Sequence, residues 1–122
     1  MTFTAEEIAK LQANTKQIMD FLLPLKKDLR ESYTIPFGRD QYGSYQYRLC
    51  ISPYQIYGGM GRASVALEDN DKTSDFNAKA NQTSFAEYTA SLCCEWKSIK
   101  QRVLSIVESE KAMTDSINNF EV

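Results

Sequence analysis

The residues best suited to bind a ligand lie between residues 33 and 67, a segment with three arginines, no lysine and one acid. Arginine guanidinium groups bind phosphate or carboxylate through paired hydrogen bonds, and they also stack on aromatic rings. Tyrosine supplies a flat ring and a hydroxyl, and glycine lets the backbone approach an anion closely. We therefore expect a site for an anionic ligand built from eight residues: Arg39, Tyr45, Tyr47, Arg48, Tyr57, Gly59, Gly61 and Arg62.

The run Gly58-Gly59-Met60-Gly61-Arg62 is the part of this segment most similar to a phosphate-binding loop. It lacks the GK[ST] ending and the strand–loop–helix context of a P-loop. A plain hairpin turn beside a Tyr-rich strand explains the same residues through turn and strand preferences alone. Both interpretations, a ligand site and an ordinary turn, stay open on the sequence.

The chain contains no histidine, which excludes Ser-His and Cys-His nucleophile pairs, a His metal ligand and a His proton switch. Its three cysteines, Cys50, Cys93 and Cys94, form neither a CxxC pair nor an even disulfide framework, so we expect reduced thiols. No pair of carboxylates stands out for acid–base work. We therefore predict that the protein is not an enzyme, with no catalytic residues, no metal and no cofactor.

Bulk properties limit the partners and the compartment. A chain of 122 residues with 43% apolar residues predicts one domain, residues 1–122, with a real core. A net charge of −2 argues against attraction to bulk nucleic acid. No run reaches the roughly 18 apolar residues of a membrane span, and the first residues do not resemble a signal peptide. We expect a cytoplasmic protein without membrane contact.

Residues 1–32 predict a helix. It begins with a capping box of Thr4 and Glu7, and its apolar positions recur at alternating spacings of three and four. Pro24 lies inside this pattern, where it removes a backbone hydrogen bond. Because the apolar stripe keeps its phase across Pro24, we predict a kink there rather than the end of the helix.

The middle of the chain predicts a small antiparallel sheet of three or four strands. Residues 33–37 and 44–51 alternate as half-buried strands do. The glycine run 58–61 predicts a hairpin turn, with residues 63–67 as its return strand. Pro53 is expected at an edge or a bulge.

Residues 68–83 are polar and predict a surface loop. Asp69, Asp71 and Asp75 invite comparison with a calcium loop. The EF-hand pattern fails because its sixth position is not glycine and its twelfth is not glutamate. We therefore expect a solvated loop.

Residues 84–120 predict a second, longer helix that begins with a capping box of Ser84 and Glu87. Its apolar stripe spans about five heptads. A helix of about 36 residues would be about 54 Å long, whereas a compact chain of this length is roughly 35 Å across. The projecting stripe predicts a homo-oligomer, a coiled coil through this helix. The alternative is a helical hairpin over the sheet, with a break near Glu110.

The expected fold class is therefore α+β: a helix, a small sheet rich in Arg, Tyr and Gly, and a long helix. This layout resembles small phage anti-defence proteins that sequester cyclic-nucleotide or cyclic ADP-ribose immune signals. The resemblance implies a non-enzymatic protein that sequesters a small anionic, nucleotide-type ligand, and it assigns no site residue. We expect arginines and tyrosines of two subunits to line one pocket. The alternative is a protein-interaction module, such as a phage-type inhibitor or adaptor that binds a host protein complex, because Tyr and Arg also anchor interfaces.

Overall fold

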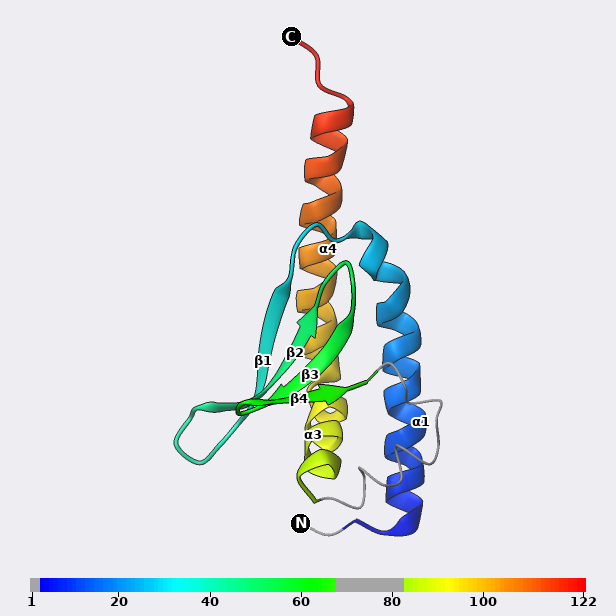
Figure 1. Ribbon diagram of the computed structural model, residues 1–122, viewed down its shortest axis with the longest axis vertical. Helices are drawn as coiled ribbons and strands as arrows, with labels where there is room; N and C mark the ends of the chain where they lie inside the picture. The colour runs from blue at the N-terminus through cyan, green and yellow to red at the C-terminus, as the bar shows by residue number, and fades with distance from the viewer. Residues whose placement is uncertain (1–2, 68–82) are drawn as a thin grey trace.

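The computed structural model describes residues 3–67 and 83–122 of the chain. The predicted surface loop and its carboxylates therefore lie outside the described residues, apart from Thr83. The fold is α+β, as predicted (Figure 1). Its helices are α1 (Ala5–Leu22), the 3-10 helix η1 (Leu23–Asp28), α3 (Thr83–Cys94) and α4 (Trp96–Asn118). The antiparallel sheet has the order β1 (Tyr33–Arg39), β2 (Tyr45–Ile51), β3 (Ile56–Met60) and β4 (Ala63–Ala66).

Helix α1 begins at the predicted capping box. The Thr4 hydroxyl accepts from the Glu7 N–H at 3.1 Å, and the Glu7 carboxylate accepts from the Thr4 N–H at 3.0 Å. The prediction that Pro24 kinks the helix without ending it is wrong: the α-helix ends at Leu22, and the chain continues as the 3-10 helix η1. The cause is the proline ring, which lacks an N–H and clashes with the carbonyl one turn earlier.

Burial alternates along β1 as predicted, whereas in β2 it increases steadily toward Ile51. Tyr47 pairs with Phe37 across the two strands. The prediction for the glycine run is wrong in its position. Gly58 and Gly59 belong to β3, and the turn is formed by Gly61 and Arg62, with Gly61 at a φ of +58°.

The reason for Gly58 lies in helix α3, far along the chain. A side chain at Gly58 would overlap the hydroxyl of Tyr88. Tyr88 is fully buried, and its hydroxyl donates to the Arg48 carbonyl of β2 at 2.9 Å. Its ring also meets those of Phe37 and Tyr47 at centroid distances of 5.3 and 5.4 Å. Burial raises the pKa of this phenol well above its ordinary value.

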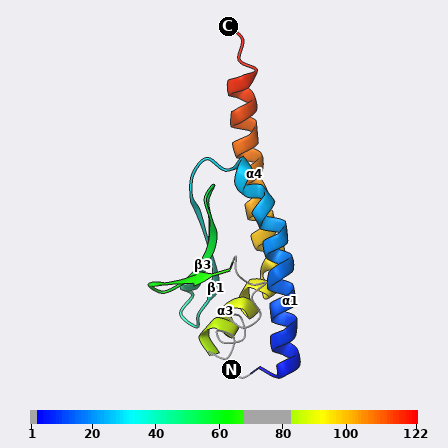
Figure 2. The ribbon, with the colours of Figure 1, turned by 45° about the vertical axis from the view of Figure 1, so that its right-hand side comes forward.

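The helices lie on one side of the sheet (Figure 2). The core forms between them and the sheet, from side chains such as Leu22, Ile35, Leu49, Leu92 and Val103. Within the described residues, no helix is long and apolar enough to cross a membrane.

The predicted C-terminal helix is in fact two helices. The break is at Glu95, not near Glu110, and α3 turns away from the axis of α4 (Figure 2). Glu95 leaves helical geometry at φ −103° and ψ 9°, and its carboxylate accepts from the Gly38 N–H of β1 at 2.8 Å. The capping box predicted at Ser84 falls on a side chain outside the described part.

Helix α4 also protects the outer edge of β1. The Arg102 guanidinium donates to the Pro36 carbonyl at 3.0 Å, and Glu95 holds the Gly38 N–H. Pro36 itself has no N–H to offer. This edge of the sheet is therefore poorly suited to pairing with another strand.

Candidate functional site

The eight predicted site residues do not form one pocket, because neighbouring residues of a strand point to opposite faces. Tyr45 and Tyr47 alternate with Arg48 along β2. The first group lies at the hairpin between β1 and β2 and consists of Arg39, Tyr45 and Tyr47. The second group lies on the outer face and in the β3–β4 turn, and consists of Arg48, Tyr57, Gly59, Gly61 and Arg62.

The second group serves the turn itself. The Arg48 guanidinium donates to the Gly61 carbonyl at 2.6 Å, and the Arg48 side chain lies where a side chain at Gly59 would be. Tyr57 forms a hydrogen bond with the Cys50 thiol, which raises the pKa of the Tyr57 phenol. Arg48 and Gly59 therefore have a structural role that explains their presence without a ligand.

The first group sits on a tightly held hairpin. The Asp40 carboxylate accepts from the N–H groups of Tyr42 and Ser44 at 2.8 and 3.0 Å. Gly43 adopts a φ of +81°, which favours glycine. The one acid of the segment thus holds the turn, and Tyr42 is 83% exposed at its tip. The exposed position of Tyr42 was not predicted, although its place between the turn residues Asp40 and Gly43 was the available signal.

Arg39 is oriented by its neighbour Tyr45. Its guanidinium carbon lies 4.7 Å from the Tyr45 ring centroid, and its Nη2 donates to the Tyr45 hydroxyl at 2.9 Å. Both side chains are exposed. Because a guanidinium carries five N–H donors, this pair still has donors to offer to an anion.

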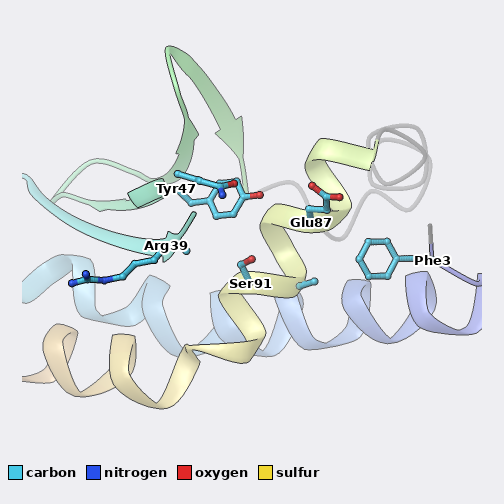
Figure 3. Close-up of a pocket in the computed structure, with 8 residues that line it drawn as sticks. Phe3, Arg39, Tyr47, Glu87 and Ser91 are labelled. Carbon is cyan, nitrogen blue, oxygen red and sulfur yellow. The ribbon is translucent and has the colours of Figure 1, made fainter. Parts of the chain in front are cut away.

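A small pocket of about 230 Å³ opens next to this pair, between the hairpin, helix α3 and the start of the chain. Figure 3 shows the side chains of Tyr47, Glu87 and Ser91 around it, while the Arg39 side chain extends away from Glu87. Burial, and then the charge of Glu87, raise the pKa of the Tyr47 phenol. The full lining is Phe3, Gly38, Arg39, Gln46, Tyr47, Glu87, Ala90 and Ser91.

The pocket combines flat apolar walls with hydrogen-bonding groups. Gly38 shapes it, because a side chain there would overlap the Tyr47 ring, and its φ is +71°. The volume is below the roughly 300–1,000 Å³ of common small-molecule sites. It suits one ring of a ligand, with the remainder on the exposed hairpin.

Comparison with models of protein families, with characterised proteins and with solved structures finds no match. The resemblance to phage anti-defence proteins therefore stays a prediction. Among the described residues, no cluster of three or more His, Cys, Asp or Glu side chains could hold a metal ion.

Proposed function

We propose that this protein is a non-enzymatic binding protein that takes a small anionic, nucleotide-type ligand at the β1–β2 hairpin. The observation that carries the proposal is the Arg39–Tyr45 pair, a guanidinium already oriented on a ring, beside a pocket with flat walls. Orienting the side chain before binding reduces the entropy lost when the ligand is held.

The parts of a nucleotide match the parts of this site. A phosphate meets the exposed Arg39 guanidinium and the Tyr45 hydroxyl, as charge-assisted hydrogen bonding favours. A base enters the pocket against Tyr47 and Phe3, where its ring can stack on an aromatic side chain whichever base it is. Glu87 accepts hydrogen bonds from an amino group or a ribose hydroxyl of the same ligand.

Thermal melts with a panel of cyclic and linear nucleotides test this function. A ligand at about 100 times its Kd stabilises the folded state by about 2.7 kcal/mol, which is a shift of several degrees in Tm. Arg39→Ala should remove the shift. Arg62→Ala is the matched control, because it loses the same charge in the β3–β4 turn and should keep the shift. A flat response of the wild type to the whole panel contradicts the proposal.

One observation favours a second function, that of a protein-interaction module. Tyr42 at the hairpin tip is 83% exposed and projects from an ordered turn, as interface anchors do. Such a module would bind a host protein through Tyr42 and Tyr45. Tyr42→Ala separates the two functions, because it removes a partner anchor and leaves the Arg39 pocket intact.

A further inference from the structure

The apolar stripe of helix α4 passes through two different surroundings. Ile99 and Val103 are buried in the core, whereas Met113, Ile117 and Phe120 are 55%, 58% and 74% exposed. Figure 1 shows why: the C-terminal end of α4 extends beyond the sheet and beyond α1. We call Met113, Ile117 and Phe120 the tail stripe.

A buried glutamate marks the boundary between the two parts. Glu110 is only 6% exposed, and its Oε1 accepts from the Tyr33 hydroxyl. Its Oε2 lies 3.8 Å from Nε of Arg30 and has no hydrogen-bond partner among the described residues. Arg30 in turn donates to the Thr114 hydroxyl at 2.7 Å.

A pocket of about 400 Å³ opens at this boundary. Arg30 comes from the segment between η1 and β1, Tyr33 is the first residue of β1, and Met113 belongs to the tail stripe. The pocket offers a guanidinium, a phenol ring and a thioether. It suits an aromatic side chain.

We propose that the tail stripe binds the tail stripe of a second copy of this chain, in antiparallel orientation. Ile117 of each copy packs on Met113 of the other, and Phe120 of each copy enters the Glu110 pocket of the other. Phe120 lies beyond the end of α4 at Asn118 and is 74% exposed, so its ring is available to a second copy.

The orientation follows from what already covers α4. Residues 30–33 of the same chain lie against the face of α4 that carries Glu110 and the tail stripe. A second helix parallel to α4 would have to continue along that face, where it would collide with residues 30–33. An antiparallel second helix contacts only the exposed end of α4. The sheet and the remaining helices of the two copies then lie at opposite ends of the dimer.

Charge and spacing also favour a second copy as the partner. Helical spacing places Thr114 and Ser116 on the two flanks of the tail stripe, and both are uncharged. In an antiparallel pair, each flank meets the same flank of the other copy, so Thr114 and Ser116 bring no like charges of α4 together. The Arg30 guanidinium that donates to Thr114 is paired with Glu110 of its own chain. The stripe is therefore complementary to itself under a two-fold axis.

This arrangement has a consequence for the ligand site. Figure 1 places the β1–β2 hairpin and the tail of α4 at opposite ends of the molecule. An antiparallel tail dimer keeps the two hairpins far apart, so each nucleotide pocket belongs to one chain. Two subunits would therefore not share one pocket, and either proposal can fail without the other.

Light scattering on the full chain tests the dimer. The wild type at micromolar concentration should have twice the 13.9 kDa mass of the chain. Ile117→Glu should halve the measured mass and leave the circular dichroism spectrum unchanged, because Ile117 is exposed. Leu104→Glu is the matched control, an exposed apolar residue on another face of α4, and it should stay dimeric. A wild type of 13.9 kDa, or a dimer that Ile117→Glu does not dissociate, overturns the proposal.

Cysteine cross-linking tests the orientation. In a background with Cys93 and Cys94 replaced by serine, Met113→Cys and Ile117→Cys are each oxidised alone and as an equimolar mixture. The antiparallel pairing predicts several-fold more cross-linked product in the mixture than in either variant alone. Efficient cross-linking of Ile117→Cys to itself, with no gain on mixing, shows a parallel pair and contradicts the proposed arrangement.

Discussion

Ile99 and Ile117 occupy the same stripe of α4 and differ in what lies opposite them. Ile99 faces the core and is 1% exposed, whereas Ile117 is 58% exposed on the projecting end. The apolar residues next to each of them recur at the same spacings of three and four. Heptad spacing therefore locates the apolar side of a helix, whereas the rest of the fold decides what covers that side.

The largest expected effect is on the covered half of the stripe. Ile99→Ala should lower the free energy of unfolding by about 2–5 kcal/mol, because it removes buried methyl groups and leaves a cavity. Urea denaturation followed by circular dichroism measures the loss. Ile117→Ala is the matched control, and it should change the stability of the monomer by no more than about 0.5 kcal/mol. Equal losses at the two positions would contradict the division of α4 into a covered and an uncovered half.

A smaller effect is expected at the boundary between the halves. The hydrogen bond to Glu110, and then burial, raise the pKa of the Tyr33 phenol above its ordinary value of about 10. The protonated phenol is thus favoured in the folded state, and its contribution is complete below about pH 10. That contribution is lost as pH rises through the folded pKa. Tm should therefore fall at alkaline pH, and it should fall less in Tyr33→Phe.

The buried phenol of Tyr88 provides a control for this pH dependence. Tyr88 also has a raised pKa, through burial in the core, and it stays in place in the Tyr33→Phe variant. Tyr33→Phe should therefore keep part of the alkaline fall in Tm. An alkaline profile identical to that of the wild type would show that Tyr33 and Glu110 do not form the boundary described above.

The sequence was sufficient for several features that depend on near neighbours. The capping box of Thr4 and Glu7 involves residues three apart, and the alternation of β1 is a property of the strand itself. The class of fold and an antiparallel sheet of three or four strands followed from such local patterns, and the sheet has four.

Where prediction from the sequence failed, distant contacts were decisive. Gly58 looked like a turn residue, yet it makes room for Tyr88, which is 30 positions later in the chain. Glu95 breaks the predicted helix while its carboxylate holds the N–H of Gly38 on β1. No local pattern reports either contact.

The predicted site residues fall into two groups for a related reason. Because the turn is formed by Gly61 and Arg62, Gly59 lies in strand β3, under the side chain of Arg48. The arginine and the glycine that suggested a phosphate loop are then occupied with each other. What is left for a ligand is the Arg39–Tyr45 pair and the pocket beside Tyr47.

We propose separate tasks for the two ends of the molecule, with ligand binding at the hairpin and assembly at the tail stripe. The most direct test is the nucleotide-induced shift in Tm of the Ile117→Glu variant. We expect a monomer with the same shift as the wild type, because the pocket around Arg39 and Tyr47 is built within one chain. A shift that disappears together with the dimer would contradict it.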